Sequence, residues 1–170
     1  MSPRAAWRLE TLGFEDVYDY TQGKLDWLAA GHPTEGTNAE RPRAADVARK
    51  DVVTCRLDDR LGEVSQRAAA GGLEAAVVVN EDRVVLGLLR KKELAGSPEQ
   101  TVERAMRPGP STFRPYAAIA EMAEVMVEHN LVSSPITTSD GKLVGLLMKE
   151  DAVRVAHELH LSHASADEVS

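Results

Sequence analysis

The chain has 170 residues, of which 43% are hydrophobic and 28% charged, and this balance excludes wholesale disorder. A formal net charge of −7 argues against a general binder of nucleic acid or of anionic membranes. The single cysteine excludes an internal disulfide and a cysteine-clustered zinc site, and no apolar run approaches the roughly 20 residues of a membrane helix. Because the N-terminus also lacks an apolar signal core, we expect a soluble, cytoplasmic protein.

The first part of the chain is rich in aromatic residues. We predict a helix over residues 2–12, a short strand over Glu15–Tyr20 and a second helix over Gly23–Ala30. One strand and two helices are too few for an independent core. We therefore expect four aromatic rings to pack onto the rest of the chain or onto a partner subunit: Trp7, Phe14, Tyr18 and Trp27. A polar stretch with two prolines follows at residues 32–43 and predicts a boundary near residue 40.

Beyond that boundary the sequence repeats itself without a gap. Thr54 aligns with Thr112, and the same offset of 58 residues aligns Gly87-Leu88-Leu89 with Gly145-Leu146-Leu147. Apolar character is kept where identity is not, as in Leu61 with Ile119. A single offset over about fifty residues is much harder to obtain by chance than a short motif, so it indicates an internal duplication.

Each copy predicts the same succession of elements. In the first copy, a helix over Arg60–Ala70 meets Gly71-Gly72, a pair that suits a left-handed helix stop. Two strands, Ala75–Val79 and Arg83–Leu89, then flank a turn. Their apolar runs do not alternate with polar residues, which is typical of strands covered on both faces. A charged helix start at Lys91-Lys92-Glu93 closes the unit.

The second copy has the same order. An amphipathic helix over residues 119–126 is followed by strands at Ser134–Thr138 and Lys142–Leu147, joined by a hairpin turn at Ser139-Asp140-Gly141. The charged start Lys149-Glu150-Asp151 closes this unit. The chain therefore predicts an α/β fold in which strand, helix, strand, strand and helix occur twice.

The duplicated part resembles a tandem pair of cystathionine-β-synthase (CBS) domains, a Bateman module, over residues 44–156. The most specific matches are segments 51–55 (Asp-Val-Val-Thr-Cys), 131–136 (Leu-Val-Ser-Ser-Pro-Ile) and 145–151 (Gly-Leu-Leu-Met-Lys-Glu-Asp). The resemblance implies two β-α-β-β-α repeats related by a pseudo-two-fold axis and packed sheet to sheet, with two clefts between them. It also implies a regulatory role, frequent homodimerisation, and binding of AMP, ADP, ATP or another adenosyl ligand.

The family's ligand contacts can be placed on this chain residue by residue. In the family, the acid that closes a Gly-x-x-Thr/Ser-x-x-Asp motif grips the ribose, and the opening strand and second-strand start of the other repeat line the slot for the base. The resemblance implies one site made of Asp151, Val53, Leu73 and Leu146. It implies a second site made of Glu93, Ser111, Leu131, Leu88 and Arg90.

Both implied sites depart from the family's motif, because the hydroxyl position is Met148 in the first and Arg90 in the second. The first site keeps the expected acid, Asp151, and we expect it to bind more readily. In the second, Glu93 is one methylene longer and lies beside a cationic cluster that serves phosphates or is only a solvated helix start. An acid at a helix start is also often only a cap, and the Gly-Leu-Leu strands are core in either case.

Residues 2–36 resemble the C-terminal end of a rhodanese domain, on the string 4–18 followed by 23–33. Rhodanese chemistry needs a nucleophilic cysteine in a loop before the first of these helices, and that loop would lie before Met1. Cys55 aligns with Phe113 in the duplication and is expected to be a small buried apolar residue. We therefore expect no sulfur transfer and no catalytic residue, although a longer upstream start would restore the loop.

The resemblances divide the chain into five parts: a rhodanese-like remnant at 1–36, a linker at 37–43, CBS repeats at 44–101 and 102–159, and a disordered tail at 160–170. His157, His160 and His163 are spaced by three near this tail. Without a partner acid they predict solvated surface rather than a metal site.

The sequence thus favours a non-catalytic regulatory module that binds an adenine nucleotide or a related adenosyl compound, as a homodimer, and signals to a separate effector protein. One alternative is a ligand-free scaffold for homodimerisation and interaction, in which Met148 and Arg90 mark clefts that have lost binding. A second alternative, residual rhodanese activity, is disfavoured because the cysteine loop is missing.

Overall fold

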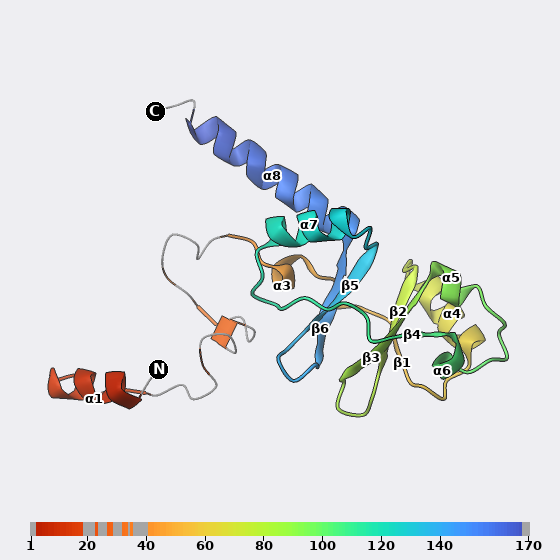
Figure 1. Cartoon of the computed structure of the whole chain (residues 1–170), viewed down its shortest axis with the longest axis horizontal. Helices are drawn as coiled ribbons and strands as arrows, with labels where there is room; N and C mark the ends of the chain where they lie inside the picture. Colours follow the sequence, from red (N-terminus) through yellow and green to blue (C-terminus); the bar gives the residue numbers. More distant parts are fainter. Residues whose placement is uncertain are drawn as a thin grey trace. The chain divides into compact units, whose positions relative to one another are not determined.

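The computed structural model (Figure 1) describes residues 3–18, 23, 27, 28, 32, 33, 35 and 41–167, with side chains described as far as residue 161. The chain divides into two compact units, Met1–Ala39 and Glu40–Ser170. No helix among the described residues is long and apolar enough to cross a membrane.

The N-terminal unit contains helix α1 (Pro3–Thr11), close to the predicted bounds. Residues 15–18 form no strand, whereas the sequence predicts one over Glu15–Tyr20. A strand needs a neighbour for its N–H and C=O groups, and no described segment of this unit pairs with these residues. Tyr20 and most of the helix predicted over Gly23–Ala30 lie outside the described residues. Trp7 is 62% exposed and Tyr18 is 80% exposed, and their packing against the rest of the chain or a partner stays a prediction.

The second unit contains two halves with matching elements. The first half holds α3 (Ala44–Val47), β1 (Thr54–Cys55), α4 (Leu61–Ala70), β2 (Ala75–Val79), β3 (Val85–Arg90) and α5 (Lys91–Leu94). The second half holds α6 (Val102–Ala105), β4 (Arg107–Pro108), α7 (Ile119–Glu128), β5 (Ser133–Thr137), β6 (Leu143–Met148) and α8 (Lys149–Asp167). Five element pairs begin at the same 58-residue offset: α3 with α6, α4 with α7, β2 with β5, β3 with β6, and α5 with α8. The predicted α/β duplication is therefore confirmed.

The sheets of the two halves have the same plan. In the first, β1 runs parallel to β2, and β3 pairs antiparallel with both β2 and β4, giving the order β1-β2-β3-β4. In the second, β5 and β6 form the antiparallel pair. Its outer strands are reduced to single bridges, a parallel one from Phe113 to Ile136 and an antiparallel one from Arg49 to Leu146.

The first helix of each half completes the core of the other half (Figure 1). Val102 of α6 is fully buried in the core formed by α4, β2 and β3, while Ala44 of α3 is fully buried in the core formed by α7, α8 and β6. Matching hydrogen bonds hold both helices. The Val102 N–H donates to the Asp59 carbonyl at 3.0 Å, and the Ala44 N–H donates to the Ala117 carbonyl at 2.8 Å. The halves are thus interlocked.

A third apolar cluster lies where the two sheets face each other. It contains buried residues from both halves: Ala75, Val77, Val79, Leu88, Leu143 and Leu146. The hairpins also join at their turns, because the Val85 N–H donates to the Gly141 carbonyl at 3.0 Å. Gly145 of β6 allows close approach of the segment after α3, since a Cβ at this position would lie 2.8 Å from the Arg49 carbonyl oxygen.

In the duplicated part, the helices after the opening strands, the strands of both hairpins and the turns begin within one or two residues of their predicted positions. Gly72 after α4 and Gly141 in the second hairpin both have positive φ, at 64° and 83°, as a left-handed stop and a tight turn require. Helix α8 continues to Asp167, although a disordered tail is predicted from residue 160. Neither Gly nor Pro occurs in residues 160–167, so no strong helix breaker ends the helix earlier.

Candidate functional site

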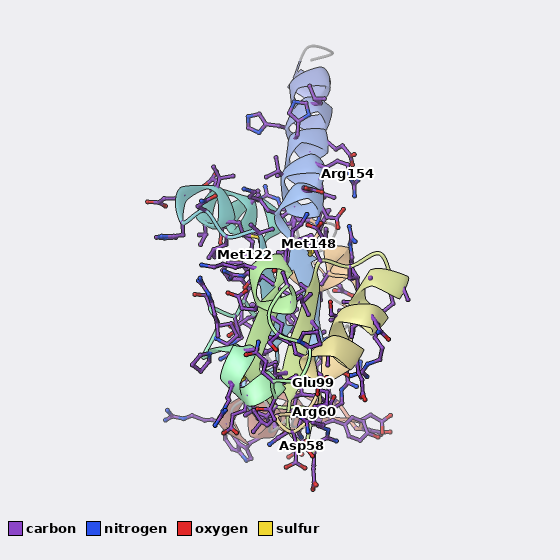
Figure 2. The ribbon with its side chains drawn as sticks, turned by 90° about the vertical axis from the view of Figure 1, so that its right-hand side faces the viewer. Asp58, Arg60, Glu99, Met122, Met148 and Arg154 are labelled. Atoms are coloured by element: carbon purple, nitrogen blue, oxygen red, sulfur yellow. The ribbon has the colours of Figure 1, made fainter. Side chains whose placement is uncertain are left out.

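A cavity of about 530 Å³ lies between the two halves. Its walls come from the start of β2, the β3–α5 junction, the start of β5 and the β6–α8 junction, where Figure 2 labels Met148. The lining residues are Arg49, Gly72, Leu73, Glu74, Ala75, Arg90, Lys91, Lys92, Val132, Ser133, Met148 and Glu150. Hollows on α4 and along α7 and α8 are each lined by one half alone. The cavity walled by both halves has the size of a small-molecule site.

The lining contains both members of several duplicated positions, so the cavity lies on the pseudo-two-fold axis. Four pairs are equivalent at the 58-residue offset: Arg90 and Met148, Ala75 and Ser133, Glu74 and Val132, and Lys92 and Glu150. In the first three pairs one residue is polar and the other apolar, and in the fourth the two charges are opposite. The cavity is therefore symmetric in its backbone and asymmetric in its chemistry.

Two polar atoms of this lining are buried without a hydrogen-bond partner among the described residues, Arg90 Nε and Ser133 Oγ. Ser133 is 2% exposed. Leaving a buried donor unpaired costs about 1–3 kcal/mol, and more for a charged group. A ligand with acceptor atoms would remove that cost at both positions.

The two acids at the helix starts are held by equivalent arginines. Arg49 Nε donates to Asp151 Oδ2 at 2.9 Å, and Arg107 Nε donates to Glu93 Oε1 at 2.9 Å. Arg107 is the duplicate of Arg49, and Asp151 is the duplicate of Glu93. Each pair ties the segment after the first helix of one half to the final helix of the other half. Neither acid lines the cavity.

Comparisons with known proteins identify the two halves. The family model for the CBS domain matches residues 44–98 and, a second time, residues 102–158. The chain belongs to the CBS-domain family. Its tandem repeats form a Bateman module, as the sequence predicts.

Individual relatives and structures agree with this assignment. The chain is 25% identical to the uncharacterized protein MK0525 of Methanopyrus kandleri over 118 residues, which are 65% of this chain and 60% of that protein. The CBS domain pair of protein MJ0100, in complex with 5′-methylthioadenosine and S-adenosyl-L-methionine, has a TM-score of 0.62 at 18% identity, and the match covers 68% of this chain and 95% of that one. CBSX2 in complex with AMP has a TM-score of 0.62 at 17% identity, covering 69% and 98%. At these identities the structural likeness establishes the fold. The rhodanese resemblance of residues 2–36 stays a prediction.

Of the nine ligand residues that the family resemblance implies, two line the cavity of this CBS pair, Leu73 and Arg90. Leu88 and Leu146 do not serve as cleft walls, because they are 1% and 0% exposed and pack in the cluster between the sheets. The side chains of Leu88 and Leu146 pack against the other repeat in this cluster.

The remaining implied residues lie around the cores of the CBS repeats. Val53 packs against the core of the first repeat and Leu131 against that of the second. Ser111 is exposed, and its carbonyl accepts a hydrogen bond from Ser134 Oγ at 2.6 Å. Sequence reasoning missed Ser133 as a cavity residue. The signal was its alignment with Ala75, because a hydroxyl there interrupts an apolar strand face.

Cys55 belongs to the core of the first repeat. It is buried in β1, and burial raises the pKa of its thiol to about 12, so the thiolate is not populated near neutral pH. The sequence-based expectation of a small buried residue is confirmed. Among the residues that the structure describes, no group of three or more His, Cys, Asp or Glu side chains is placed to hold a metal ion.

The ion pair between Glu93 and Arg107 makes the free energy of unfolding depend on pH. Burial by itself would raise the pKa of Glu93, but hydrogen bonds from the Arg90 N–H and the Arg107 guanidinium outweigh it and hold the pKa below its usual range. A carboxylate with a lowered folded-state pKa stabilises the fold above its unfolded-state pKa, and this contribution is lost as the pH falls through the folded-state value.

We therefore expect the free energy of unfolding to fall more steeply below about pH 5 in the wild type than in Glu93→Gln, which keeps the acceptor but not the charge. Urea denaturation between pH 7 and pH 3 measures this difference. Glu103→Gln, at an exposed glutamate of α6, is the matched control and should follow the wild-type curve. Parallel curves for the wild type and Glu93→Gln would contradict the assignment.

Proposed function

We propose that this CBS pair is a non-catalytic regulatory module that binds an adenine nucleotide or a related adenosyl compound in the cavity between its repeats. The observation that carries the proposal is a cavity of about 530 Å³, walled by both repeats, in which Arg90 Nε and Ser133 Oγ are buried without partners among the described residues. The bound AMP of CBSX2 and the adenosyl ligands of the MJ0100 pair support the ligand class.

Binding of a ligand in this cavity would change the relative orientation of the two repeats. A ligand in the cavity contacts the junctions β3–α5 and β6–α8, and each junction leads into the last helix of its repeat. The ion pairs Arg49–Asp151 and Arg107–Glu93 cross between the halves next to the same junctions. A ligand that favours one relative orientation of the repeats shifts the population toward it, and a separate effector protein would read the shift.

Thermal denaturation with AMP, ADP, ATP, NAD and S-adenosylmethionine tests the proposal. A ligand at one hundred times its Kd is expected to stabilise the chain by about 2.7 kcal/mol.

The absence of a shift with all five compounds would overturn the proposal and favour a ligand-free homodimerisation scaffold. One observation favours that second candidate. The α7–α8 face exposes Val127 and Val153, which line an apolar hollow of about 770 Å³. Light scattering of the ligand-free chain would then show a dimer, and Val127→Lys together with Val153→Lys would return it to a monomer.

A further inference from the structure

The residues that line the cavity favour one class of ligand over others. The inference about that class rests on the proposed function. We infer that its ligand carries phosphate and binds as a single copy across the pseudo-two-fold axis, with the phosphate held by Arg90 and Ser133. These are the two lining residues whose buried polar atoms lack partners within the described part of the chain.

The charges of the lining favour an anion. Six charged side chains line the cavity, and two of the cations are already engaged. Lys91 Nζ pairs with Glu74 Oε1 at 2.5 Å, and Arg49 pairs with Asp151. The lining then has two further cations, Arg90 and Lys92, and one further carboxylate, Glu150. A guanidinium bonds a phosphate through charge-assisted hydrogen bonds, which are about twice as strong as neutral ones, and Ser133 Oγ can donate a further bond.

The same charges disfavour a cationic ligand. The sulfonium of S-adenosylmethionine would lie in a cavity whose buried unpaired charge is positive. Its one anionic acceptor for Arg90 is the α-carboxylate, which carries a single charge next to an ammonium, whereas the phosphate of a nucleotide carries a charge of about −1.5 to −2. Burying two like charges together costs free energy that the base and ribose contacts must offset. The chain's own residues therefore select a nucleoside phosphate over a sulfonium.

The asymmetry of the lining fixes the number of ligands. At the equivalent position across the axis, Arg90 is replaced by Met148 and Ser133 by Ala75. A second phosphate related by the axis would meet a thioether and a methyl group, neither of which donates a hydrogen bond. One phosphate site per chain follows.

Isothermal titration of the full chain with AMP, adenosine, S-adenosylmethionine and pyrophosphate tests this inference. We expect one AMP per chain and an affinity for AMP about 10- to 100-fold above that for adenosine. Arg90→Met should remove that advantage and leave the adenosine affinity unchanged. Ser133→Ala should weaken AMP about 2- to 10-fold. Both variants place in one half the residue that the other half already carries, so they are compatible with the fold. Arg104→Met, at an exposed arginine of α6, is the control and should bind AMP as the wild type does.

The outcomes separate the inference from the proposed function. Equal affinities for AMP, adenosine and S-adenosylmethionine, or no effect of Arg90→Met, would overturn the inference and leave the proposed function standing. Two AMP molecules per chain would overturn the single-ligand claim. Pyrophosphate competing with AMP in the wild type but not in Arg90→Met supports the phosphate site, whereas pyrophosphate binding that excludes adenosine compounds altogether would overturn both.

Discussion

Leu61→Ala and Ile119→Ala are each expected to lower the free energy of unfolding by about 2–5 kcal/mol while leaving one cooperative transition. The two residues are equivalent in the duplication, and both are fully buried, one in each repeat's core. Because Val102 of the second repeat completes the first core and Ala44 of the first repeat completes the second, loss of one core removes a helix from the other. Urea denaturation followed by circular dichroism measures both quantities.

Val127→Ala is the matched control, because Val127 is 59% exposed on α7, and its effect should stay within about 0.5 kcal/mol. Two separated transitions in Leu61→Ala would show that the second repeat folds without the first. That result would contradict the exchange of first helices as a stabilising interlock.

Leu146→Ala is expected to cost about 2–5 kcal/mol of stability and to leave the Kd for AMP within twofold of the wild type. Leu146 is fully buried between the sheets, where it packs with Leu88 and Val77, and the cavity lining does not include it. Denaturation and titration of the same variant give the two numbers.

Val132→Ala is the matched control, because this residue lines the cavity and is not buried between the sheets. Val132 lines the cavity and is 54% exposed, so its replacement should change stability by less than about 0.5 kcal/mol. A Leu146→Ala variant that is stable but binds AMP poorly would restore Leu146 to the ligand contacts that the family resemblance implies.

The order of helices and strands could be predicted because the same order occurs in both copies of the duplicated sequence. The unbroken apolar run Ala75–Val79 and the glycines at 72 and 141 mark strands and turns by local chemistry, and the structure places them there. The exchange of first helices could not be predicted. Helices α3 and α6 have four residues each, which is too short for a periodic apolar pattern. A sequence pattern also does not show which other element a helix face packs against.

The site was predicted less well than the fold, for a physical reason. The acids Asp151 and Glu93 are visible in the sequence, but their arginine partners are 102 and 14 residues away, and only the fold brings them together. The resemblance also could not show which apolar residues remain for a ligand. Leu73 lines the cavity while Leu146 is used in packing, although both are leucines at implied contact positions.

A crystal structure of the chain with AMP at saturating concentration would show where the nucleotide binds. We expect one AMP in the cavity between the repeats, with phosphate oxygens within hydrogen-bond distance of Arg90 Nε and Ser133 Oγ. AMP bound in the hollow along α7 and α8, or two AMP molecules related by the pseudo-two-fold axis with no phosphate at Arg90, would contradict this binding mode.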